Sequence, residues 1–210
     1  MFQVAPVGLM TSNEHHKTYS VAASGGSRHL SGYDDDALMV RAQDGDKEAY
    51  EVLVGRHADL VLAIATRFLC NPDAGRDVAQ EVFLDLWLSR LRYRPEGRFR
   101  RYLTTLVLNR CRDATRRVGS EQRRRDGLAT QGSADPRTPS DEVVQRQSSQ
   151  RLLAALARLD PADREILVMR FAMDLAYEEI AEQTARPTGT LRSRVFHSLR
   201  KLRTLLEGES

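Results

Sequence analysis

Residues 177–202 read YEEIAEQTARPTGTLRSRVFHSLRKL, and their pattern is that of two short helices joined by a tight turn. We expect one helix over 177–183 and the other over 188–206. Ala181 is small, as a residue must be where the two helices of a helix-turn-helix touch. Leu191, Val195, Leu199 and Leu202 recur at steps of four, four and three residues, so we expect them to point inward. The stretch therefore predicts a helix-turn-helix.

The other face of the second helix is polar, basic and aromatic. A guanidinium fork, a hydroxyl and an aromatic ring at the start of such a helix suit base edges and thymine methyls in a major groove. The candidate DNA-binding residues on this helix are Thr190, Arg192, Ser193, Arg194, Phe196, His197 and Arg200. The alternative is an ordinary helical hairpin with a basic surface.

Outward from this motif, the chain reads as all-α, with two small helical domains joined by a flexible linker. Apolar residues at steps of three and four predict helices from Asp34, over 46–70, from Asn71 to about 91, and over 99–118. Asp160 as N-cap and Pro161 as the first helical residue predict another helix through about Met173. No useful β alternation is present. We expect a flexible tail over 1–33, a first domain over 34–118, a linker over 119–147 and a second domain over 148–207.

The composition limits the classes of function. Hydrophobic residues make up 41% and charged residues 29%, which is typical of a globular chain. No apolar run approaches the roughly 20 residues that span a bilayer, so we expect a cytoplasmic protein without stable membrane insertion. Cys70 and Cys111 offer neither a disulfide framework nor a metal-ligand spacing. We expect no metal, no cofactor and no enzymatic activity, because no phosphate loop or nucleophile–base signature is present.

Positive charge is concentrated in two segments. Between Arg90 and Arg125 thirteen arginines stand against three acids, a net charge of +10. The second segment, 192–203, holds four arginines and a lysine with no acid among them. Two separate basic elements indicate two contacts with a polyanion, and therefore nucleic-acid binding.

A second motif, DAGRDVAQEVFLDLW over 73–87, precedes the helix-turn-helix by about a hundred residues. Together and in this order, the two motifs resemble the second and fourth conserved regions of extracytoplasmic-function (ECF) sigma factors. The resemblance covers about residues 34–206. It implies partners: core RNA polymerase at its beta-prime clamp and beta flap, promoter DNA, and an anti-sigma factor. It also implies transcription initiation, for a stress or envelope-signal regulon.

The resemblance assigns roles to surfaces that the periodicity places outward. Val78, Val82 and Leu86 form the core side of their helix. The outward acidic face, expected to dock on the polymerase, comprises Asp77, Gln80, Glu81 and Asp85. The resemblance further places minus-35 reading on the helix-turn-helix face.

The resemblance places the minus-10 contacts on the helix over 99–118. Its core side is Leu103, Val107, Cys111 and Ala114, and the loop at 95–97 could enclose a base flipped from an opened strand. The arginines expected to hold phosphates are Arg98, Arg100, Arg101, Arg116 and Arg117. The minus-10 residues are Arg98, Tyr102, Asn109, Asp113, Arg116 and Arg117, with Arg112 as an alternative to Asp113.

Three positions depart from the family's pattern. Ala176 stands where a serine N-cap is frequent, a loss of about 1 kcal/mol. Ala185 stands where a turn glycine is frequent, and Tyr102 replaces a frequent tryptophan. The competing interpretation of the whole chain is a helix-turn-helix activator or repressor whose first domain binds a ligand or dimerises. That interpretation does not explain the acidic face or the arginine-rich helix.

Overall fold

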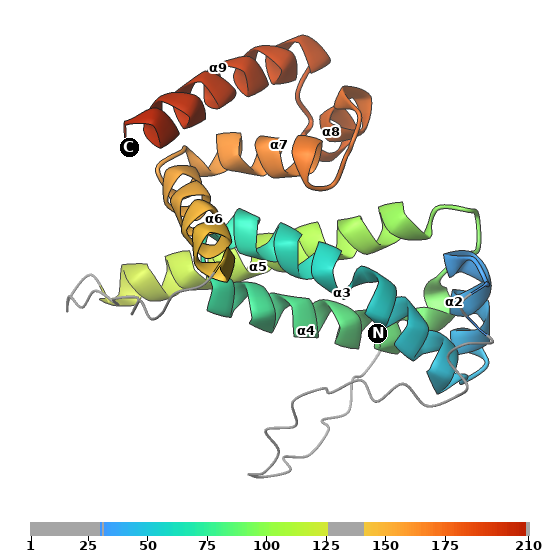
Figure 1. Cartoon of the computed structure of the whole chain (residues 1–210). Helices are drawn as coiled ribbons and strands as arrows, with labels where there is room; N and C mark the ends of the chain where they lie inside the picture. The colour runs from blue at the N-terminus through green and yellow to red at the C-terminus, as the bar shows by residue number, and fades with distance from the viewer. Residues whose placement is uncertain (1–29, 31, 126–140, 209–210) are drawn as a thin grey trace.

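The computed structural model describes residues 30, 32–125 and 141–208, and all regular structure within them is helical. The first layer contains α2 (Asp35–Gln43), α3 (Lys47–Leu69), α4 (Pro72–Leu88), the 3-10 turn η1 (Arg90–Arg92) and α5 (Phe99–Arg125). The second contains α6 (Asp141–Ala157), α7 (Pro161–Phe171), α8 (Tyr177–Thr184) and α9 (Thr188–Glu207). Figure 1 shows α7, α8 and α9 lying over the layer formed by α3, α4 and α5. The all-α prediction is confirmed.

Side-chain caps start the helices where the sequence predicts them. Asp34 accepts a hydrogen bond from the Ala37 amide at 2.7 Å, and Asp46 accepts one from the Ala49 amide at 3.0 Å. Asn71, which precedes Pro72, accepts hydrogen bonds from two amides in the first turn of α4. Asp160, which precedes Pro161, accepts a hydrogen bond from the Ala162 amide and caps α7. Each cap satisfies amides that have no partner within the helix, so the polar residues between the apolar segments fix where helices begin.

The structure differs from the sequence prediction at the ends of the linker and of the N-terminal tail. Helix α5 continues through Arg125 and α6 already begins at Asp141, so helix enters the predicted linker 119–147 from both sides. Glutamate, glutamine and arginine favour helix without producing an apolar pattern, which explains the error. Residues 126–140, 1–29 and 31 lie outside the described part of the chain. Leu30, assigned to the tail, is buried in the core with 4% of its surface exposed.

Helix α3 is the centre of the fold. It packs against α2, α4 and α5 in its own layer and against α6 and α7 in the other. Its buried side chains Leu53, Val61 and Ile64 are fully inaccessible, and the apolar residues of the second layer continue the same core. The two halves of the chain are therefore packed together through α3.

The contact between α3 and α4 is unusually close at one glycine. A Cβ on Gly75 would stand 2.4 Å from Thr66 Oγ1 and 2.9 Å from Thr66 Cα. The second distance involves backbone, so rotating the threonine side chain cannot relieve it. Only glycine allows the two helices to approach this closely.

We predict that Gly75→Ala lowers the free energy of unfolding by about 1–3 kcal/mol, because the methyl group forces α4 away from α3. Chemical denaturation measures the change. The control is Gly55→Ala, an exposed position within α3 where an added Cβ meets nothing within 4 Å. This second substitution is expected to stabilise the helix by about 0.5–1 kcal/mol. Equal effects from both substitutions would contradict a steric constraint at Gly75.

Candidate nucleic-acid and polymerase interface

The acidic face of α4 is divided between solvent and α5. Asp77 and Gln80 are exposed, and their side chains make no hydrogen bond or ion pair with another described residue. Glu81 instead pairs with Arg117, at 3.2 and 3.3 Å, and lies 3.8 Å from Arg110. Asp85 accepts a hydrogen bond from Arg110. The two residues therefore do not point only outward, as was expected: Glu81 is shared between solvent and α5, and Asp85 pairs with α5.

The two arginines that face these acids are held in their charged form. The hydrogen bond from Arg110 to Asp85 raises the pKa of the Arg110 guanidinium, and the hydrogen bond from Arg117 to Glu81 raises that of Arg117. Arg117 is therefore already paired within the chain, although it was expected to hold a DNA phosphate. Because the pair is exposed, it is expected to contribute little to stability.

An apolar edge lies beside the exposed acidic residues. Leu84, Leu88 and Leu91 are 57%, 67% and 71% exposed, and they follow one another at steps of four and three along α4 and η1. Sequence reasoning missed them. The sequence did contain a signal for them. Leu84 and Leu88 each follow a core residue, Val82 and Leu86, by two positions, so they repeat with the same helical period on another side of the helix.

Helix α5 presents a mixed stripe to solvent. Arg98 just before the helix, and Asn109 and Arg116 on it, are exposed, and Asp113 is half-buried with its carboxylate 3.3 Å from Arg116. On the opposite side Cys111 is fully buried, and burial raises the pKa of its thiol to about 12. The thiol is therefore protonated at neutral pH, in keeping with a packing role.

Tyr102 does not belong to the exposed stripe. Its hydroxyl lies 3.1 Å from Ser89 Oγ, and its ring packs at 5.0 Å from that of Tyr93. The ring is half-buried in the junction between η1 and α5. The sequence pattern placed it on the polar side of α5 because a tyrosine fits either environment.

Two arginines of α5 contact the other layer. Arg101 lies 3.4 Å from Glu179 and 3.2 Å from Glu182 on α8, and Arg112 lies 2.5 Å from Glu165 on α7. Both arginines were considered for DNA contacts. In this arrangement they instead join the arginine-rich helix to the helix-turn-helix.

The helix-turn-helix presents most of its predicted face. Thr190, Arg192, Ser193, His197 and Arg200 are exposed. Phe196 is 64% exposed, with its ring edge-on to His197 at 5.5 Å. The outer face of α9 therefore offers an aromatic ring among polar and basic side chains.

Two positions of α9 differ from expectation. Arg194 Nε lies 2.7 Å from Asp163 Oδ1 on α7, so this guanidinium fastens α9 to α7 instead of facing the groove. Leu199 is 40% exposed, and Ser198 is buried in its place. The inward seam thus runs through Leu191, Val195, Ser198 and Leu202, at steps of four, three and four, which follow the helical period more closely.

The helix-turn-helix carries two of the expected departures, Ala176 just before α8 and Ala185 in the turn between α8 and α9. Ala176 has no side-chain oxygen to cap α8, and only the reciprocal bond is made, from its amide to Glu179 Oε2 at 2.9 Å. Ala185 adopts a left-handed conformation with φ of 54°. A residue with a Cβ is strained in this region, where glycine is not.

Comparison with known families identifies the two layers. The family described as Sigma-70 region 2 matches residues 53–121, and that described as Sigma-70, region 4 matches residues 149–202. RNA polymerase sigma factor CarQ of Myxococcus xanthus is 36% identical over 170 residues, covering 80% of this chain and 95% of the relative. The chain belongs to the ECF group of the sigma-70 family. It is a sigma factor that directs RNA polymerase to promoters.

Other relatives agree with this assignment. The ECF RNA polymerase sigma-E factor of Haemophilus influenzae is 29% identical over 172 residues, covering 78% of this chain and 90% of the relative. The structure of CnrH in complex with the cytosolic domain of CnrY shares the fold with a TM-score of 0.60 at 23% identity, covering 84% of this chain and 99% of CnrH. The matches to both regions in order decide against a helix-turn-helix activator or repressor with an unrelated first domain.

A co-crystal structure from Bartonella quintana, of the sigma factor RpoE with the anti-sigma factor NepR, also has a TM-score of 0.60. Its identity is 21%, and the match covers 75% of this sigma factor and 96% of that chain. Within the described ranges of this sigma factor, no helix has the length and hydropathy required to cross a membrane.

We predict that Ala185→Gly raises the free energy of unfolding by about 0.5–1 kcal/mol, because glycine adopts the left-handed turn without strain while losing more chain entropy on folding. Thermal or chemical denaturation measures the gain. Ala154→Gly, at an exposed position within α6, is the control and should cost about 1 kcal/mol. Destabilisation by both glycines would show that the turn is not strained.

Proposed function

We propose a residue-level division of labour for this sigma factor. The exposed part of the α4 acidic face docks on basic helices of the polymerase clamp. The α5 stripe and the loop at 95–97 take a base from the opened minus-10 strand. The exposed face of α9 reads the closed minus-35 duplex, and the second domain contacts the beta flap. The observation that carries this proposal is the presence of sigma region 2 and region 4 in this order on one chain, each with an exposed polar face.

Asp77 and Gln80 supply the core of the polymerase contact. Both are exposed on α4, and both are available to donors of a basic partner surface. Glu81 and Asp85 contribute to the polymerase contact in two ways. Their carboxylates can accept further hydrogen bonds, and their pairs with Arg110 fix the orientation of α4. The acidic face therefore combines two residues that meet the partner with two that hold the helix in place.

Asn109 is the residue of α5 best suited to read a base. It is exposed, and a side-chain amide offers both a donor and an acceptor to a base edge. Arg98 and Arg116 are exposed at either end of the stripe, where they can hold phosphates without specifying sequence. Asp113, beside Arg116, orients that guanidinium. Arg117 can hold a phosphate as well only after its ion pair with Glu81 is broken.

On α9, Arg192, Ser193, Phe196 and His197 lie where base edges of a major groove would be read, and Thr190 and Arg200 lie where phosphates would be held. Arg192 lies over the Tyr177 ring at 5.4 Å, which restricts its guanidinium before DNA is bound. Arg194 acts through its ion pair with Asp163, by holding the reading helix against α7.

Three further properties belong to the proposal. The sigma factor works in the cytoplasm, catalyses no reaction itself, and is restrained by an anti-sigma factor. The last of these is supported by the match to a sigma factor solved with the anti-sigma factor NepR. The paired residues Arg101 and Arg112 support a change of arrangement on promoter binding, because α7 and α8 occupy them in the described form.

The polymerase contact is tested by Asp77→Arg. We expect at least a tenfold loss of affinity for core RNA polymerase, because a cation would face a basic surface. Fluorescence anisotropy with labelled sigma factor measures it. Glu51→Arg on the exposed side of α3 makes the same change of charge and serves as the control. Unchanged core binding by Asp77→Arg, or an equal loss in both variants, would contradict the assignment.

The separation of the two DNA contacts is tested by Asn109→Ala. We expect nearly unchanged binding of a minus-35 duplex but impaired strand opening, because Asn109 meets an unstacked base and α9 meets an intact groove. Permanganate reactivity of unpaired thymines in the bound promoter measures opening. Arg116→Ala is the comparison and should weaken binding of all sequences alike. The assignment is wrong if Asn109→Ala abolishes duplex binding and leaves opening intact.

A further inference from the structure

The connection between α4 and α5 is bound along its length to α2. Gln43, at the C-terminal end of α2, donates through Nε2 to the carbonyl oxygens of Arg90 at 2.9 Å and Tyr93 at 2.8 Å. Arg90 Nε donates in return to the Ala42 carbonyl at 3.1 Å. These three bonds fix the η1 turn against one end of α2.

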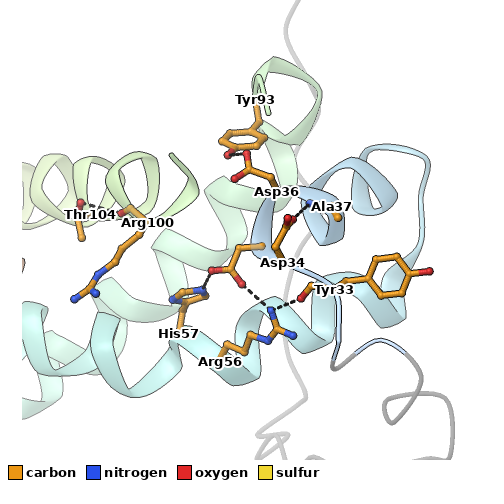
Figure 2. Close-up of polar contacts among 10 residues, drawn as sticks. Tyr33, Asp34, Asp36, Ala37, Arg56, His57, Tyr93, Arg100 and Thr104 are labelled. Carbon is orange, nitrogen blue, oxygen red and sulfur yellow. Dashed lines mark hydrogen bonds and ion pairs between the residues drawn. The ribbon is translucent and has the colours of Figure 1, made fainter. Parts of the chain in front are cut away.

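The N-terminal end of α2 binds the same connection further on. Asp36 Oδ1 accepts a hydrogen bond from the Tyr93 hydroxyl and another from the Gly97 amide at 3.3 Å. Figure 2 shows the Tyr93 ring pointing at the Asp36 carboxylate. Burial and this carboxylate raise the pKa of Tyr93, so the hydroxyl remains a donor. Gly97, with φ of 70°, takes a backbone conformation that favours glycine.

Tyr93 transmits this anchorage to the first turn of α5. Its side chain is buried, with its ring 5.8 Å from that of Phe99 and 5.0 Å from that of Tyr102. Tyr102 is in turn joined to Ser89 at the end of α4. The loop at 95–97 and the start of α5 are therefore positioned through Tyr93, whose hydroxyl is held by α2.

Helix α2 is itself rigidly placed. Asp35 binds Arg56 at 2.9 Å and His57 at 2.8 Å, both on α3. Figure 2 shows Arg56 and His57 side by side below the start of α2, with Arg56 also reaching the Tyr33 carbonyl. The apolar side of the helix, through Leu38 and Met39, is fully buried. Burial of this apolar side holds α2 in place. The hydrogen bonds from α2 to the 90–97 connection therefore position the connection and are not needed to hold the helix.

We propose that α2 is a positioning element for opened-strand recognition. Asp36 and Gln43, two helical turns apart, hold the 90–97 connection so that the loop and Asn109 meet an unstacked promoter base in one fixed geometry. The inference rests on the proposed function of α5 and extends it to residues that do not touch DNA. Preorganisation of this kind improves discrimination between bases, because a wrong base cannot be accommodated by movement of the loop.

The test uses holoenzyme assembled from core polymerase and each full-length sigma variant. A preferred single-stranded DNA sequence is first selected from a random library by wild-type holoenzyme. Binding is then measured for that sequence and for its three single-base variants at the most selective position. The ratio of affinities is the readout, because a variant that is merely less stable loses active protein without changing this ratio.

Asp36→Ala and Tyr93→Phe are each expected to lower the ratio about fivefold to tenfold, and the double variant should be no worse than Asp36→Ala alone. Asp36→Asn is expected to preserve it, because the amide oxygen accepts the same two hydrogen bonds. Asp44→Ala, on an exposed position at the other end of α2, is the matched control and should leave the ratio unchanged. Tyr93→Phe keeps the ring, so core packing is retained.

The inference is overturned if Asp36→Ala and Tyr93→Phe both match Asp44→Ala while Asn109→Ala loses discrimination. In that case α5 reads the strand and α2 is only structural. If Asn109→Ala also keeps full discrimination, the proposed function of α5 fails, and the inference fails with it. Additive losses in the double variant would likewise show that the two residues do not act through one hydrogen bond.

Discussion

The close crossing of α3 and α4 at Gly75 is the constraint from which the rest of the first layer follows. The glycine lets α4 approach the backbone of Thr66, and this contact fixes the rotation of α4 about its own axis. Once that rotation is set, Val78 and Val82 are buried, Asp77 faces solvent, and Glu81 faces α5. A small change at the crossing would therefore alter which acidic residues of α4 face the polymerase and which face α5.

The caps explain why so much of the helical order could be predicted. Asp34, Asp46, Asn71 and Asp160 are local signals, since each binds an amide two or three residues ahead. A single sequence contains such signals in full. The extension of α5 to Arg125 escaped prediction because charged residues continue a helix without marking it by apolar periodicity.

The candidate site was predictable only to the extent that it depends on one helix at a time. Periodicity separates inside from outside, which placed Asn109, Arg192 and Phe196 correctly on exposed faces. It cannot say which neighbour an outward residue meets. The pairs Arg110–Asp85 and Arg194–Asp163 join helices far apart in the sequence, and they depend on tertiary packing that no local pattern encodes. Leu30 was missed for the same reason, because a lone apolar residue has no period.

The bracing of Glu81 by Arg117 has a consequence for genetics. A charge reversal at Glu81 brings two cations together, so a second change at Arg117 in the same gene could restore the helix pair without restoring any contact with polymerase. At Asp77, which has no such neighbour among the described residues, a compensating change would have to arise in the polymerase subunit. Suppressors within the same gene would thus mark acidic residues of α4 that face α5, and suppressors in a polymerase gene would mark those that face the polymerase.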